Sequence, residues 1–153
     1  MKNNKILAIG IPSYNGEKYL DRCINTFVDE ELFDKIEVII VNDGSTDNTK
    51  EIAEKYQKLY PKMVRVINKE NGGHGSGINK GIELARGKYF KVVDADDWVD
   101  EEQYDKLLEI LINEDTDLIL TDYSEARSFE DKLYKVEYYK NLTPGVEYHL
   151  DDV

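Results

Sequence analysis

Residues 86–98, RGKYFKVVDADDW, hold the feature around which the rest of the chain can be arranged. The apolar and aromatic side chains of residues 89–93 predict a short buried strand, which begins just after a glycine. Three carboxylates follow that strand directly: Asp94, Asp96 and Asp97. Successive side chains of an extended backbone point to opposite sides, so we expect Asp94 and Asp96 to project together, while Asp97 faces away or begins the next turn.

The three acids predict a metal that carries a phosphorylated ligand. Two converging carboxylates repel each other, and a divalent cation relieves that repulsion. Hard oxygen ligands suit Mg²⁺ or Mn²⁺, which are usually held by one or two carboxylates together with substrate phosphates. The alternative is a solvated loop that caps the following helix, because aspartate favours turns and N-caps. The acids alone leave both interpretations open.

Composition and charge set limits on the partners of this chain. Its 153 residues are about the length of one domain, and 32 acidic against 20 basic residues give a net charge of −12. That charge opposes non-specific attraction to nucleic acid or anionic lipid. The single cysteine, Cys23, cannot form an internal disulfide, and no apolar run approaches the ~20 residues that span a bilayer. We expect no leader before the first strand and a reducing, cytoplasmic setting.

Apolar runs alternate with amphipathic segments along the first 125 residues. Strands are predicted at residues 6–11, 36–41, 63–67, 89–93 and 118–120. Helices are predicted at residues 17–29 and 48–60, after the glycine-rich residues 71–77, and after the acids. Cys23 lies on the apolar face of the first helix and is interpreted as a core thiol. This order predicts an α/β fold with a mostly parallel sheet and helices on both faces.

The segments after four strands are expected to share one edge of that sheet. Ligands of parallel sheets bind outside the carboxyl ends of the strands. Tyr14, Asp43, Asn71 and Asp94 each lie in a segment that follows a predicted strand. His74 lies in the glycine-rich stretch and is interpreted as a solvated side chain, with phosphate binding or acid–base catalysis as the alternative.

Three competing motifs match the sequence poorly. A dinucleotide fingerprint needs glycines after the first strand, where residues 12–14 read PSY. A P-loop needs Gly-Lys-Ser or Gly-Lys-Thr, but residues 77–79 read GIN. A phosphatase of the haloacid dehalogenase type uses the first aspartate of an Asp-x-Asp pair as nucleophile. It expects that pair after its first strand and a threonine two residues later, where this chain has Trp98.

Four segments taken together resemble the family-2 glycosyltransferases. They are Pro12-Ser13-Tyr14-Asn15, residues 41–49 (VNDGSTDNT), residues 71–81 (NGGHGSGINKG) and residues 87–97 (GKYFKVVDADD). Their order and spacing match the family over about the first 125 residues. The resemblance implies a GT-A, Rossmann-like fold in which residues 1–125 bind a nucleotide-diphosphate sugar. Residues 126–153 would then begin an acceptor-side region or form edge strands.

The resemblance also implies roles for particular residues. Pro12 and Tyr14 would flank the base, with Tyr14 stacking on it, and Asp43 would accept a hydrogen bond from it. Asp94 and Asp96 would form the Asp-x-Asp motif that serves the ribose and the metal. The metal ligands would be Asp94, Asp96 and Asp97, with Mn²⁺ or Mg²⁺ as the cofactor. The other residues implied at the donor site are Ser13, Asn15, Asn71, Gly72, Asn79 and Ala95.

Two departures from the family pattern bear on activity. Many members carry an arginine just before the asparagine of the third segment, where this chain has Ile78. Lys80 could substitute, although a helix-surface lysine is the simpler interpretation. The downstream general base of an inverting transfer has no convincing counterpart before Val153, since Asp122 reads as a turn residue. We therefore expect the donor-binding portion of a longer enzyme.

The resulting expectation is a metal-dependent, inverting glycosyltransferase domain that uses a UDP-sugar. Its acceptor would be a hydroxyl of a saccharide or lipid-linked molecule, in polysaccharide or glycolipid synthesis, with no nucleic acid partner. Further regions could bring the protein to the inner face of the membrane. A phosphate-ester hydrolase with Asp94 as nucleophile and a catalytically silent nucleotide-binding module are the alternatives. The sugar, the linkage and the oligomeric state stay open.

Overall fold

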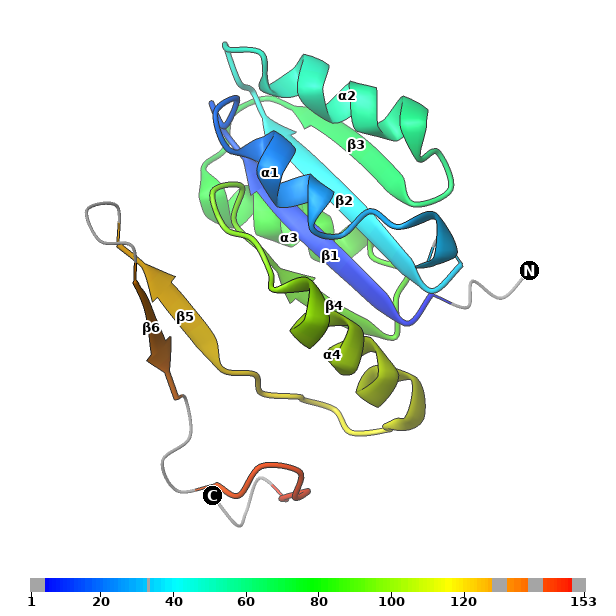
Figure 1. Ribbon diagram of the computed structural model, residues 1–153. Helices are drawn as coiled ribbons and strands as arrows, with labels where there is room; N and C mark the ends of the chain where they lie inside the picture. Colours follow the sequence, from blue (N-terminus) through cyan, green and yellow to red (C-terminus); the bar gives the residue numbers. More distant parts are fainter. Residues whose placement is uncertain (1–4, 33, 128–131, 138–141, 150–153) are drawn as a thin grey trace. The chain divides into compact units, whose positions relative to one another are not determined.

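The computed structural model describes residues 5–32, 34–127, 132–137 and 142–149 (Figure 1). The chain divides into two compact units, Met1–Asn113 and Glu114–Val153. All the residues that the sequence predicts for the donor and metal sites belong to the first unit. The domain boundary predicted at residue 125 stays a prediction.

The first unit is built on a four-stranded parallel sheet. Its strands are β1 (Leu7–Ser13), β2 (Ile36–Asp43), β3 (Val64–Lys69) and β4 (Tyr89–Val92), in the order β3-β2-β1-β4. Every residue of β1 and β2 is buried, as the near-continuous apolar runs of these two strands require in the centre of a parallel sheet. The predicted parallel sheet is confirmed.

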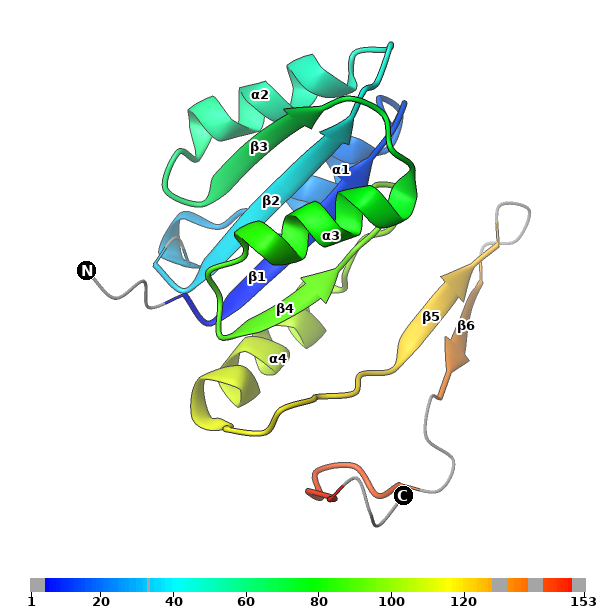
Figure 2. The same cartoon turned by 180° about the vertical axis from the view of Figure 1, so that it is seen from behind.

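Helices cover both faces of the sheet, which also confirms the prediction. They are α1 (Leu20–Asn25), α2 (Thr49–Leu59), α3 (His74–Leu84) and α4 (Glu101–Asn113), with a short 3-10 helix at Glu30–Leu32. Figures 1 and 2 show α3 on one face and α1 and α4 on the other. Phe27, which follows α1, meets Tyr104 of α4 edge to face at 5.5 Å between ring centroids. Within the described ranges, no helix is both long and apolar enough to cross a membrane.

Helix α3 packs on the sheet through glycines rather than through large side chains. The helix begins at His74, inside the stretch that the sequence suggests is a loop, and its buried residues are Gly77 and Gly81. A Cβ at Gly77 would lie 3.0 Å from Cβ of Pro12, and a Cβ at Gly81 would lie 3.3 Å from Cζ of Phe90. Ile82, which the apolar pattern assigns to this helix, is 53% exposed. The backbone of α3 therefore lies close against β1.

A buried ion pair fixes the end of α3 that is remote from the carboxyl ends of the strands. The side chain of Glu37 is 3% exposed and accepts a hydrogen bond from Arg65 Nη1 at 3.1 Å. The Nη2 group of Arg65 donates to the carbonyl of Leu84 at 3.2 Å, and the backbone N–H of Arg86 donates to Glu37. The pair thereby connects β2, β3 and the end of α3.

The second unit contains one antiparallel hairpin, β5 (Tyr123–Ala126) and β6 (Leu133–Val136). The weak alternation of Leu133 and residues 135–139 suggests an edge strand or a hairpin, and the structure shows a hairpin up to Val136. Tyr138 and Tyr139 lie outside the described residues. The strand predicted at residues 118–120 is wrong. Leu118 is 67% and Leu120 46% exposed, and no described residue pairs with this segment as a neighbouring strand. Three apolar residues do not make a strand without such a partner.

Candidate functional site

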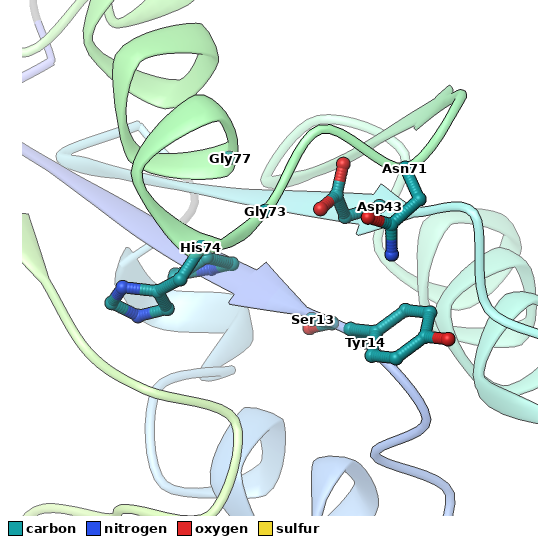
Figure 3. A pocket seen from close by; sticks show the side chains of 8 residues that line it. Ser13, Tyr14, Asp43, Asn71, Gly73, His74 and Gly77 are labelled. Atoms are coloured by element: carbon teal, nitrogen blue, oxygen red, sulfur yellow. The ribbon is translucent and has the colours of Figure 1, made fainter.

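A pocket of about 270 Å³ opens where β1 and β2 end and α3 begins. Eight residues line it: Pro12, Ser13, Tyr14, Asp43, Asn71, Gly73, His74 and Gly77. Figure 3 shows His74 at one end of the pocket and Tyr14 and Asn71 at the other. Tyr14 is 56% exposed, so its ring is available to a ligand. The structure thus brings together three of the four residues expected along one edge, Tyr14, Asp43 and Asn71.

Asp43 is a buried carboxylate in this pocket, and it is paired. It is the last residue of β2 and stands in register with Lys69, the last residue of β3. The Nζ group of Lys69 donates to Asp43 Oδ1, and the backbone N–H of Gly72 donates to the same oxygen at 2.9 Å. Burial opposes ionisation of Asp43, but these hydrogen bonds and the lysine charge hold the pKa of the carboxyl below its usual value. Asp43 therefore stays an ionised acceptor at neutral pH.

Lys69 also contacts the start of α3. Its Nζ group donates to Ser76 Oγ at 2.9 Å and to the carbonyl of Glu70 at 2.6 Å. The lysine side chain is only 25% exposed. Its positive charge compensates the carboxylate of Asp43, and its hydrogen bonds connect the ends of β2 and β3 with the start of α3.

The loops after β1 and β2 are joined by reciprocal hydrogen bonds between residues 15–17 and 45–49, here called the loop latch. The N–H of Asn15 donates to Ser45 Oγ at 3.0 Å, and the N–H of Thr46 donates back to Asn15 Oδ1 at 2.9 Å. Glu17 Oε2 accepts from the N–H of Asn48 at 3.1 Å. Asn15 takes a left-handed backbone conformation, with φ of 50°, which asparagine tolerates better than most residues. The latch thus fixes the backbone that follows Tyr14.

Asp47 closes the latch and binds the first residue of α2, whose N-cap residue is Asn48. Its carboxylate accepts from the N–H of Glu17 at 3.1 Å and from the N–H of Thr49 at 3.0 Å. Burial opposes its ionisation, yet these hydrogen bonds hold the pKa of Asp47 below its usual value. The carboxylate thereby satisfies a backbone N–H of the first turn of α2 that has no partner within the helix.

The acids after β4 do not lie on extended backbone. The strand ends at Val92, and the N–H of Asp97 donates to the carbonyl of Asp94 at 2.9 Å, which closes a turn. The extended backbone presumed for residues 94–97 is therefore wrong, because the strand ends before these residues. We call residues 94–97 the acid turn.

The acid turn fits a cation that arrives with phosphate. No group of three His, Cys, Asp or Glu side chains in the described part of the chain is arranged to hold a metal by itself. The pKa of Asp97 is nonetheless raised by desolvation and by the charges of Asp96 and Asp94, so the three carboxylates repel one another. Mg²⁺ needs only one or two protein carboxylates when substrate phosphates complete its shell. Any one or two of Asp94, Asp96 and Asp97 would supply that number of carboxylates.

Helix α1 contacts the acid turn and Trp98, the residue that follows it. The thiol of Cys23 donates to the carbonyl of Asp94 at 3.6 Å, and the guanidinium of Arg22 lies 3.4 Å from the ring centroid of Trp98. Cys23 is fully buried, and burial together with the neighbouring acids raises the pKa of its thiol to about 12. The interpretation of Cys23 as a core thiol is confirmed.

Several predicted residues lie outside the pocket wall. Asn15 and Gly72 support it, through the latch and through the bond to Asp43. Asn79 is exposed on α3, and Ala95 lies beside Gly16. Whether these residues or the acid turn contact a ligand stays a prediction.

Two residues of the site were missed or underrated from the sequence. His74 Nε2 lies 2.7 Å from Asp94 Oδ1 and so connects the pocket with the acid turn. The interpretation of His74 as merely solvated overlooks this partner, although its side chain is 60% exposed. Lys69 was missed altogether. Its position at the end of β3, opposite Asp43 at the end of β2, is the signal that could have identified it.

The parallel sheet, the pocket at its carboxyl edge and the acid turn together define an α/β protein of the Rossmann-like class. A family model described as glycosyl transferase family 2 matches residues 8–146. The chain belongs to glycosyl transferase family 2, and its fold is the GT-A fold.

Named relatives and solved structures agree with this assignment. Glycosyltransferase GlyG of Streptococcus pneumoniae serotype 4 is 35% identical over 78% of this chain and 40% of its own length. Chondroitin synthase of Pasteurella multocida is 35% identical over 72% of this chain and 11% of its own length. The crystal structure of S. aureus TarS 1–349 in complex with UDP matches 71% of this chain and 32% of its own, with 29% identity and a TM-score of 0.60.

The chain corresponds to only part of these proteins. It covers between 30% and 40% of the length of the first four curated relatives. The comparisons therefore establish the family and the fold of this part.

Proposed function

We propose that the unit Met1–Asn113 binds a nucleotide-diphosphate sugar, a UDP-sugar, together with Mg²⁺ or Mn²⁺. It would serve a glycosyltransferase that passes the sugar, with inversion, to an acceptor hydroxyl during polysaccharide or glycolipid synthesis. The observation that carries this proposal is the pocket in which exposed Tyr14 stands beside the buried, ionised Asp43. A planar base can stack on the ring of Tyr14, and an N–H group at the edge of that base can donate to the carboxylate of Asp43.

The comparisons support the choice of ligand. S. aureus TarS 1–349 has been solved with UDP and with UDP-GlcNAc, and both structures resemble this chain at 29% and 30% identity. In our proposal Tyr14 stacks on the base, Asp43 accepts its N–H, and Asp94 and Asp96 face the ribose and the diphosphate. A divalent cation, when bound at the acid turn, would neutralise the charge that develops on the departing diphosphate.

The chain's own residues account for donor binding and not for the whole transfer. Asp122, the acid considered for the general base, lies in the second unit and forms an ion pair with Lys135 at 3.1 Å. We therefore assign no general base and propose that the described residues bind the donor but transfer sugar poorly by themselves. A cytoplasmic location stays a prediction.

Calorimetric titration tests the donor site directly. UDP, UDP-GlcNAc and GDP-mannose are titrated into the protein with and without Mn²⁺. Wild type is expected to bind UDP and UDP-GlcNAc in a metal-dependent way, and Asp96→Ala is expected to lose that dependence. Asp105→Ala removes an exposed carboxylate of α4 and serves as the matched control. No UDP binding in either condition, or equal binding by Asp96→Ala, would refute the proposed site.

A further inference from the structure

One side-chain contact joins the pocket to the acid turn. His74, the first residue of α3, places Nε2 2.7 Å from Oδ1 of Asp94, which follows β4. Because an ionised carboxylate only accepts, Nε2 is the donor. The two side chains are 60% and 47% exposed, so the contact lies at the surface of the site and not in the core.

The backbone of Asp94 is already held by other residues. Its carbonyl accepts from the N–H of Asp97 at 2.9 Å and from the thiol of Cys23 at 3.6 Å. What remains free is rotation of the carboxylate about its own side-chain bonds. The hydrogen bond from His74 to Oδ1 restricts that rotation and leaves Oδ2 as the oxygen that a ligand meets.

We propose that His74 is a positioning residue of the donor site that acts through Asp94. This inference rests on the proposed function, because it assigns Asp94 to the ribose or the cation. Side chains that hydrogen-bond to a metal-binding group orient it, and their loss commonly weakens metal affinity by about tenfold or more. His74 would thus set the orientation in which Asp94 receives a nucleoside diphosphate with its cation.

If the contact served folding alone, His74→Ala would lower the melting temperature and leave UDP binding unchanged. We expect the reverse. An exposed pair contributes little to folding, so His74→Ala should leave the melting temperature within about 2 °C of wild type. Its effect should instead appear as weaker binding of UDP in the presence of Mn²⁺, by about tenfold.

Two conservative variants of His74 show which ring nitrogen, Nε2 or Nδ1, makes the contact. Glutamine carries its amide nitrogen at a reach close to that of histidine Nε2, whereas the amide of asparagine is closer to the position of Nδ1. We therefore expect His74→Gln to retain most of the binding, and His74→Asn to bind as weakly as His74→Ala. His149→Ala removes the other histidine of the chain, which is exposed in the second unit, and should bind like wild type.

The contact itself is tested without any ligand. Two-bond nitrogen–proton correlation spectra of the imidazoles report which ring nitrogen carries the hydrogen. The His74 signals should show a protonated Nε2 and should shift in Asp94→Asn, while those of His149 stay in place. Unchanged His74 signals in Asp94→Asn would show that the contact is absent and would overturn the inference.

Calorimetry with UDP and Mn²⁺ then separates the two proposals. If wild type binds and the affinities fall in the order wild type, Gln, then Asn and Ala together, the inference is supported. If wild type and His74→Ala bind equally, or if Gln binds as weakly as Ala, the positioning role is refuted and the proposed function stands. If wild type binds no nucleotide while the spectra show the contact, the proposed function fails and the donor role of His74 fails with it.

Discussion

Replacing Lys69 by methionine should destabilise the protein strongly at neutral pH and weakly in acid. The change leaves the buried carboxylate of Asp43, whose side chain is 4% exposed, without its cation. Removing one partner of a buried pair commonly costs about 3–5 kcal/mol. Because the lysine side chain is 25% exposed, we take the lower end and expect a loss of about 3 kcal/mol at pH 7.

The pH dependence follows from the pKa of Asp43. In wild type that pKa lies below its usual value, so the carboxylate stabilises the fold above the unfolded pKa of about 3.9 and the contribution is lost as pH falls through the folded pKa. In Lys69→Met burial is opposed mainly by the N–H of Gly72, and we expect the folded pKa to rise above the unfolded one. The protonated form then carries no buried charge, so the difference from wild type should shrink towards pH 4.

Urea denaturation followed by far-ultraviolet circular dichroism at pH 7 and pH 4 measures both quantities. The double variant Lys69→Met/Asp43→Asn removes both charges and should recover most of the stability lost at pH 7. A loss below about 1 kcal/mol at pH 7 would refute the reasoning, since unpairing a buried charge costs more than that. An equal loss at both pH values would also refute it.

Substitutions at four further positions probe the packing of the first unit. Gly77→Ala should lower the free energy of unfolding by about 1 kcal/mol, because its Cβ would meet Pro12 at 3.0 Å. The Cβ added in Gly75→Ala would have no atom within 4 Å, so this change should raise the free energy of unfolding by up to about 1 kcal/mol. Similar urea midpoints for the two variants would contradict this pair of predictions. Asn15→Ala should lower the melting temperature more than Asn15→Gly, because only glycine keeps the left-handed backbone without strain. Equal melting curves would argue against that strain. Glu37→Gln, which leaves a partly buried arginine without its counter-charge, should cost about 2 kcal/mol in urea unfolding, and an unchanged midpoint would count against a structural pair.

The sheet could be predicted from the sequence because its signals are local. Residues 6–11 are apolar throughout and residues 36–41 are apolar apart from Glu37, and such short runs favour strands buried on both faces. Residues 118–120 show why the same signal fails when it is short. A strand forms only where a neighbouring strand pairs with its backbone, and three apolar residues do not reveal whether such a neighbour exists.

The site was predictable in outline, since parallel strands bring the segments that follow them to one edge. Its internal contacts were not, because they depend on register and on where a strand stops. Lys69 meets Asp43 only because β2 and β3 pair with these two residues opposite each other. The orientation of Asp94 depends on the turn that begins after β4 ends at Val92, and no periodicity announces that end.

The loop latch has a consequence for the entropy of binding. Residues 15–17 and 45–49 hold one another through backbone and side-chain hydrogen bonds, so their conformational freedom is lost when the chain folds. A ligand that stacks on Tyr14 therefore meets a wall that is already ordered, and such preorganisation reduces the entropy lost on binding. At the His74 end of the pocket, the side chains of His74 and Asp94 are exposed. Substitutions meant to change how the protein recognises the part of the ligand remote from Tyr14 are therefore best made at the His74 end, where they leave the loop latch intact.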